Sequence, residues 1–169
     1  MSFSIRRAVE GDAESLLRHR QVLTAETPFM LYEPSELTKT PDDERLRISR
    51  LNGRSNSLLL VAEDGLSIVG NLTAVGGEVR RLRHVATLSL GVLRSHWGQG
   101  VGRGLLQHVV QWAESAQLHR LELTVHTANL RALSLYLQAG FQVEGVRRDS
   151  ICVEGRYVDE YLMSRLSAA

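Results

Sequence analysis

The 169-residue sequence predicts one α/β domain, with a mixed and mostly antiparallel central sheet and helices on both of its faces. Short apolar runs alternate with segments of helical periodicity along the whole chain. Two tight-turn signals, Asp64-Gly65 and Glu154-Gly155, each join a pair of apolar runs as in a β-hairpin. No linker or low-complexity segment interrupts residues 1–169, so we expect a single domain over that whole range.

The composition limits the class of protein. Hydrophobic residues make up 43% of the chain and charged residues 23%, which is typical of a globular domain. The formal net charge of +1 argues against nucleic acid as a partner. The lone Cys152 excludes an internal disulfide, and the six histidines lack metal-ligand spacing, so we expect no metal. With no signal peptide or membrane-spanning run, we expect a cytoplasmic protein with no membrane partner.

The first half of the chain carries two helix-start signals. Asp12 is the expected N-cap of the first helix. At the second, Thr40 precedes Pro41 and two acidic residues, and Gly53 can end that helix. The expected elements, in order, are a strand over 3–8, a helix from 11–12, a helix over 40–52, and strands over 57–63 and 66–76.

The second half alternates strands and helices before a closing pair of strands. Gly140 follows an apolar-periodic segment, where a left-handed residue commonly ends a helix. Apolar residues at helical spacing between Leu105 and Ala113 predict the longest helix. The expected elements are a strand over 85–93, a helix over 102–116, a strand over 121–125, a helix over about 128–139, and strands over 141–153 and 156–166.

The glycine-rich segment from Gln99 to Gly104 is the clearest functional signal. It lies between a predicted strand and a predicted helix, where backbone N–H groups and the helix N-terminus favour a phosphate or pyrophosphate. Its spacing does not fit the dinucleotide fingerprint G-x-G-x-x-G. A P-loop is also excluded, because the only lysine, Lys39, is far away.

Three motifs together resemble the Gcn5-related N-acetyltransferase family. The first is Q-x-x-G-x-G, from Gln99 to Gly104, and the second is N-x-x-A-x-x-x-Y, from Asn129 to Tyr136, followed by Gly140-Phe141. The third is the closing segment 154–163, similar to bacterial L-amino-acid and ribosomal-protein N-acetyltransferases. The resemblance covers about residues 3–166. It implies the acyl-CoA N-acyltransferase fold, with acetyl transfer from acetyl-CoA to a primary amine and, by analogy, a homodimer.

The resemblance also implies roles for individual residues. Val92 would donate its backbone N–H to the oxyanion, and Tyr136 would act as the acid for the departing thiolate. Asn129 would contact the cofactor from the next helix. The loop residues would hold the pyrophosphate through their N–H groups, and the central strand would pair with the pantetheine arm. The residues are Gln99, Gly100, Val101, Gly102, Arg103 and Gly104 for the loop, and Leu90, Val92 and Leu93 for the strand.

The general base is not evident from the sequence. Many relatives carry a glutamate near the position of Thr87, which this chain lacks. His84, near the start of the central strand, is the candidate base, with Glu33 and Glu122 more distant. A site without a dedicated carboxylate suits an α-amine, because roughly one α-amine in ten is already neutral at pH 7.

The acceptor site is expected at the segment from Thr27 to Pro34. We expect Tyr32 and Glu33 to face the acceptor. Phe29 and Leu31 are expected to pack into the core beneath the loop; the alternative is that this apolar run lines an acceptor site for an apolar amino acid. The first hypothesis is a small-molecule acceptor, a free amino acid or similar α-amine. A protein N-terminus and a non-catalytic acyl-CoA sensor are the alternatives.

Overall fold

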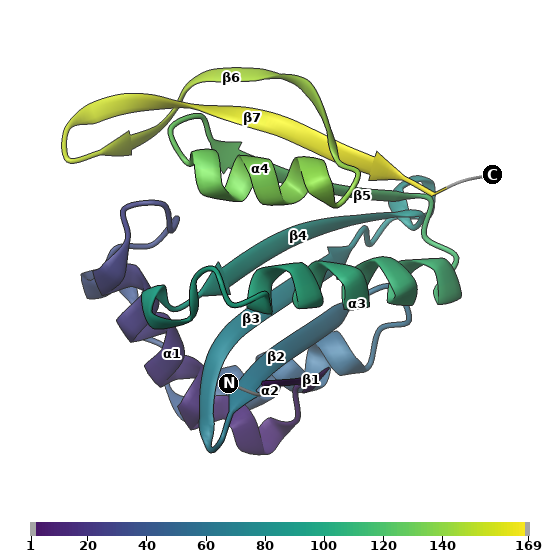
Figure 1. Ribbon diagram of the computed structural model, residues 1–169. Helices are drawn as coiled ribbons and strands as arrows, with labels where there is room; N and C mark the ends of the chain where they lie inside the picture. The colour runs from purple at the N-terminus through teal and green to yellow at the C-terminus, as the bar shows by residue number, and fades with distance from the viewer. Residues whose placement is uncertain (1–2, 168–169) are drawn as a thin grey trace.

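The computed structural model describes residues 3–167 and has a seven-stranded sheet at its centre (Figure 1). The strand order is β1-β2-β3-β4-β5-β7-β6, and every neighbouring pair is antiparallel except β4 and β5. This arrangement confirms the predicted mixed, mostly antiparallel sheet. The strands are β1 (Ser4–Arg7), β2 (Leu58–Asp64), β3 (Ser67–Gly76), β4 (Val85–Val92), β5 (Arg120–His126), β6 (Gln142–Val153) and β7 (Arg156–Leu166).

Helices cover both faces of the sheet, as predicted (Figure 1). Helices α1 (Ala13–Glu26) and α2 (Pro41–Asn52) lie on one face, and α3 (Val101–Ser115) and α4 (Leu130–Gln138) lie on the other. The alternating residues of β2 are therefore buried on both sides, one set in each of two apolar clusters. Burial on both faces explains why β2 reads as a continuous apolar run rather than an alternating one.

Helix α1 packs on strand β3 and reaches the neighbouring central strand β4 through Leu23. A Cβ built on Gly91 would stand 2.3 Å from Leu23 Cδ2, so a larger residue there would displace the Leu23 side chain. His19 of α1 also contacts Asn71 of β3, with 3.0 Å between Nε2 and Oδ1. These contacts fix the end of α1, and with it the connector to α2, over the middle of the sheet.

The second helix begins as predicted, and the first begins differently. Thr40 Oγ1 accepts the N–H of Asp43 at 3.2 Å, and the Asp43 carboxylate accepts the N–H of Thr40 at 2.9 Å. This reciprocal pair is a capping box, and it confirms Thr40 as the start of the helix. Asp12 does stand at the N-cap of α1, but its carboxylate makes no capping bond. It instead accepts from Arg6 at 2.7 Å and from the N–H of Val9 at 2.7 Å.

Candidate active site

A cleft opens where β4 and β5 separate. The two strands pair only at one end, where the last register pair in the described chain joins Thr87 to Glu122. Beyond that pair the strands diverge (Figure 1). The cleft has a volume of about 1740 Å³, and residues of both strands and of the helices on both faces line it. The edge of β4 beyond Thr87 is therefore bare toward the cleft.

The bare edge presents backbone N–H groups. The N–H of Leu93 donates to Val69 O on β3 at 2.9 Å, and its carbonyl accepts from the N–H of His96 at 2.9 Å. Because N–H directions alternate along a strand, Leu90 and Val92 direct theirs away from β3 and toward the cleft. Leu90 and Val92 thus keep the geometry expected for contact with pantetheine. Leu93 does not, because both of its backbone groups are engaged within the protein.

The glycine loop places further N–H groups at the mouth of the cleft. Gly98 and Gly100 have φ values of +75° and +88°, in the left-handed region that favours glycine. Helix α3 then begins at Val101, and the N–H groups of residues 101–103 have no helical acceptor. The N–H of Gly104 is different, because it donates to Gly100 O at 2.9 Å. The first three N–H groups of α3 are therefore free to hold an anion such as a diphosphate, whereas the N–H of Gly104 is engaged.

Three motif residues, Gln99, Gly102 and Gly104, also shape the loop and its packing. A Cβ on Gly102 would stand 2.9 Å from Leu135 Cδ2 of α4, and one on Gly104 would stand 2.8 Å from Ile5 Cδ1 of β1. Both glycines therefore let α3 pack closely. Gln99 is exposed, and its side-chain amide donates to Ser95 O at 2.8 Å, which braces the turn before the helix.

Positive charge gathers beside this loop. The ring of Trp97 lies 4.8 Å from the Arg131 guanidinium and 5.5 Å from that of Arg94. The Trp97 indole also donates to Val92 O at 2.8 Å, which ties the loop to the end of β4. Trp97 and Arg131 both line the cleft, and the sequence motifs alone gave no role to either. An anion at the α3 N-terminus would lie close to these cations.

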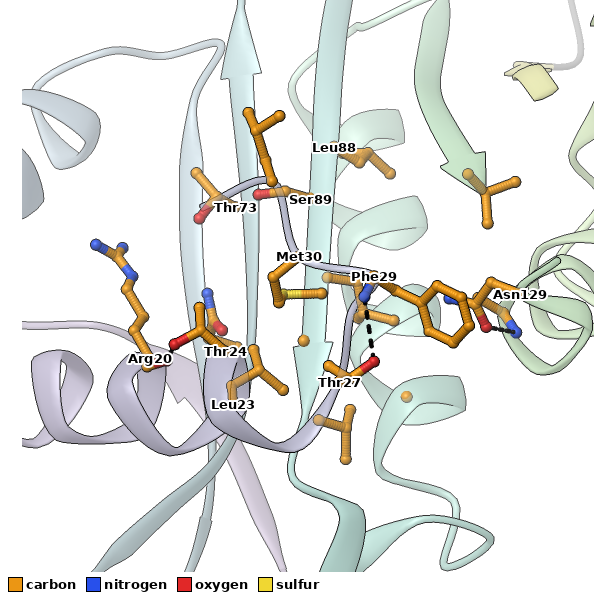
Figure 2. Close-up of a pocket in the computed structure, with 18 of the residues that line it drawn as sticks. Arg20, Leu23, Thr24, Thr27, Phe29, Met30, Thr73, Leu88, Ser89 and Asn129 are labelled. Atoms are coloured by element: carbon orange, nitrogen blue, oxygen red, sulfur yellow. Dashed lines mark hydrogen bonds between the residues drawn. The ribbon is translucent and has the colours of Figure 1, made fainter. Parts of the chain in front are cut away.

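Helix α4 brings Asn129 and Tyr136 to the same cleft. Asn129 caps α4 by accepting the N–H of Ala132 at 3.2 Å, which leaves its amide nitrogen for a ligand (Figure 2). Tyr136 is 7% exposed and packs edge-on against Phe141, with ring centroids 5.9 Å apart. Within residues 3–167 its hydroxyl makes no hydrogen bond. Burial raises the pKa of Tyr136 to about 12.

The connector between α1 and α2 covers the opposite side of the cleft. Figure 2 shows Phe29 and Met30 projecting from it. Phe29 lies edge-on to the His126 ring, with centroids 5.4 Å apart, so it lines the cleft instead of packing beneath the connector. Leu31 is 72% exposed, so the expectation that it packs into the core is wrong.

Of the two expected acceptor residues, one lies in the cleft. Tyr32 is 58% exposed and lines it. Glu33 lies outside the lining residues, and its N–H donates to the Glu36 carboxylate at 2.8 Å. Glu36 lines the cleft in its place. The short 3-10 turn at Pro34–Glu36 changes which of these side chains points inward.

A buried charge cluster lines the cleft on the side of α1 and α2. Glu44 of α2 is 1% exposed, and its two carboxylate oxygens accept from Arg20 at 3.0 Å and from Arg47 at 2.9 Å. Arg47 also donates to Thr73 Oγ1 on β3 at 2.9 Å. Burial, followed by the charge of Arg47, lowers the pKa of Arg20. We call Arg20, Glu44 and Arg47 the arginine cluster; one carboxylate shared by two guanidinium groups leaves it with net positive charge.

The structure places the expected base, His84, away from the cleft and brings another imidazole to it. His84 is exposed beside His119 at the paired end of β4, outside the cleft and about 26 Å along the strand from Val92. Glu122 also lies at the paired end, where Arg120 donates to it at 2.8 Å. His126, at the other end of β5, lines the cleft. Local sequence could not identify it, because nothing near it in the chain shows where β5 leaves β4.

Comparison with known proteins agrees with this geometry. Residues 21–141 match the sequence profile of the acetyltransferase (GNAT) family. The chain belongs to this family. The L-amino acid N-acetyltransferase AaaT of Escherichia coli is 28% identical over 162 residues, which cover 91% of this chain and 99% of that protein.

Solved structures of GNAT acetyltransferases share the whole fold. One from Streptococcus pneumoniae is 27% identical with a TM-score of 0.95, covering 99% of this chain and 100% of that one. The Salmonella typhimurium acetyltransferase yncA, solved with its cofactor acetyl-CoA, is 20% identical with a TM-score of 0.87, covering 100% and 98%.

Family membership establishes the coarse activity. The chain is an acyltransferase of the GNAT type that moves an acetyl group from acetyl-CoA to an amine. Free N–H groups at α3 and along β4 fit the diphosphate and the pantetheine amides of that donor. Within residues 3–167, no helix has the length and hydropathy needed to cross a bilayer.

Proposed function

We propose that this acetyltransferase acetylates the α-amino group of a free amino acid. The observation that carries the proposal is the arginine cluster, whose net positive charge on the acceptor side of the cleft suits a carboxylate. A free amino acid has a carboxylate beside its amine. The first residue of a protein does not, because its carboxyl carbon is in a peptide bond.

The placement of the cluster supports the same acceptor. Arg47 contacts Thr73, which pairs with Ser89 of β4, and cross-strand partners share a face of the sheet. Ser89 directly precedes Leu90, where the bare edge of β4 begins to present N–H groups. A carboxylate held at Arg47 therefore directs the neighbouring amine toward that edge. The donor reaches the same edge from the α3 and α4 side.

The reaction needs a hydrogen-bond donor for the oxyanion and another for the thiolate. The amine lone pair attacks the thioester carbonyl carbon, and the Val92 N–H stabilises the oxygen that becomes negative. The C–S bond then breaks, and its electron pair leaves with sulfur. Tyr136 donates a hydrogen bond to that thiolate. The amine loses its proton, and the products are an N-acetyl amino acid and coenzyme A.

The decisive experiment compares matched acceptors by thiol release from acetyl-CoA. We expect an L-amino acid to exceed its own carboxamide in kcat/KM by about 10- to 100-fold, the range for a hydrogen bond to a charged group. Arg47→Gln should remove most of that difference, because it deletes half of the proposed carboxylate site. Arg45→Gln is the matched control, since Arg45 lies on the same helix but pairs with Asp42 outside the cleft.

Two outcomes would contradict the proposal. Equal or faster turnover of the carboxamide, or of a short peptide with a free N-terminus, would favour a protein N-terminal acetyltransferase. Measurable acetyl-CoA binding with no thiol release for any amine would favour a non-catalytic sensor.

A further inference from the structure

His126 is the least satisfied polar side chain of the cleft. It is 8% exposed, and neither ring nitrogen has a hydrogen-bond partner within the described residues. Burying a polar group without a partner is unfavourable, and such groups are rare in folded proteins. A bound ligand that supplies the missing partner would explain why the ring lies there.

The ring lies on the acceptor side, level with the bare edge of β4. Thr87 pairs with Glu122, and because the strands are parallel, His126 is level with Gly91 across the opening. His126 faces away from the core under α3 and α4, since its neighbour Val125 is buried in that core. Its contact with Phe29 of the connector places it on the face where the acceptor enters.

We propose that His126 is the general base that takes the proton of the acceptor's ammonium group. The inference rests on the proposed α-amine reaction. A neutral imidazole nitrogen accepts one proton from the ammonium, and the freed lone pair attacks the thioester carbon. When the C–S bond breaks, the remaining surplus proton on nitrogen passes to the thiolate. The proton on His126 then leaves to water, so one proton is released per turnover.

Each carboxylate that lines the cleft, and its other histidine, has at least one hydrogen-bond partner within the protein. Glu44 is shared by two arginines, Asp43 caps α2, Glu36 accepts a backbone N–H, and Glu160 accepts from Ser150. His96 contacts Asp64 at 3.2 Å and Ser95 at 2.9 Å. Among the lining residues that the structure describes, His126 therefore has lone-pair capacity that no protein group uses.

The charged groups that share a face with His126 come from β6 and β7. Glu160 of β7 pairs with His126 across the sheet, so both side chains share the acceptor face. Ser150 donates to Glu160 at 2.5 Å, and Arg147 of β6 lies 3.6 Å from it. The connector contributes the uncharged Phe29 ring. The cross-strand neighbour of the imidazole is therefore a carboxylate, opposite in sign to the imidazolium that forms during turnover.

The test is the pH dependence of kcat/KM for an amino acid acceptor. We expect His126→Gln to lower kcat/KM about 100-fold at pH 7, with the gap narrowing as the pH rises past the α-amine pKa near 8. Acetyl-CoA affinity, measured by calorimetry, should not change. His84→Gln is the matched control, because that exposed histidine lies outside the cleft, and its profile should match the wild type.

If His126→Gln does not fold, a second measurement on the unmodified enzyme still tests whether an enzyme base takes the proton. Two acceptors whose amine pKa values differ by about one unit should show the same fall of kcat/KM at low pH. The reason is that the low-pH side of the profile reports the protonation of the enzyme base, not of the acceptor. The proposal is overturned if the low-pH fall of kcat/KM shifts with the pKa of the acceptor. It is also overturned if His126→Gln raises KM but leaves kcat and the pH profile unchanged. Equal turnover of an amino acid and its carboxamide would contradict the proposed acceptor. The pH test of His126 would still hold, because it needs only an amine acceptor.

Discussion

At the scale of single residues, Tyr136 shows how burial changes what a side chain can contribute. Its raised pKa of about 12 compares with about 8.5 for a thiol, so full proton transfer to a thiolate costs about 5 kcal/mol. A neutral phenol can still donate a hydrogen bond to the departing sulfur. The hydroxyl has no protein partner in the described chain that would compete for this bond.

Replacement of that hydroxyl tests the role directly. We expect Tyr136→Phe to lower kcat about 10- to 100-fold, the cost of one hydrogen bond to a charged group, while the acetyl-CoA Kd stays the same. Steady-state kinetics and calorimetry measure the two quantities. Tyr157→Phe serves as the control, because Tyr157 is 72% exposed. Weaker acetyl-CoA binding with an unchanged kcat would instead show that Tyr136 positions the donor.

The two histidines show which site residues the sequence can reveal. His84 was favoured because it lies near a predicted central strand, but the structure leaves it at the end where β4 and β5 are paired. His126 stands three residues before the motif residue Asn129, yet no local pattern distinguishes it. Its importance depends on where two strands diverge and on Phe29, which is far away in the chain. The spacing of residues in the sequence does not reveal non-local packing of this kind.

At the scale of elements, local signals predicted well. The Thr40-Pro41 start, the glycine turn before α3 and the hairpin turn after Asp64 each depend on neighbours in the chain, and each is found. The arginine cluster was not anticipated, because its members come from two helices and meet only when α1 packs on α2. Sequence alone would place Glu44 at the surface, because charged residues are rarely buried unless they are paired. The two arginines that pair with it are known only from the structure.

Helix α2 links a local cap to the acceptor site. We expect Thr40→Ala to lower the free energy of unfolding by about 1 kcal/mol, because it removes the capping oxygen for the first turn. Urea denaturation measures this loss. The acceptor KM should rise as well, since Glu44 and Arg47 follow within two turns. Ser49→Ala, on the exposed side of the same helix, should change neither quantity, and an equal effect there would argue against the cap.

At the scale of the whole molecule, the sheet separates the residues that we propose for the donor from those that we propose for the acceptor. The free N–H groups of α3 and the cleft residues of α4 lie on one face, and the arginine cluster and the connector lie on the other. The opening between β4 and β5 is where the two sides meet. The predicted α/β architecture required helices on both faces, but no residue pattern indicated that β4 and β5 would diverge and connect those faces.

This arrangement predicts direct transfer between two substrates bound together. Each substrate has its own face, so neither must leave before the other enters, and initial-rate plots against acetyl-CoA at several acceptor concentrations should give intersecting lines. Parallel lines would indicate an acetyl-enzyme, in which a side chain carries the group between half-reactions.

Cys152, the single thiol, is exposed on β6 and does not line the cleft. We therefore expect Cys152→Ser to keep wild-type kcat and KM and the intersecting pattern, because no covalent step at that sulfur takes part.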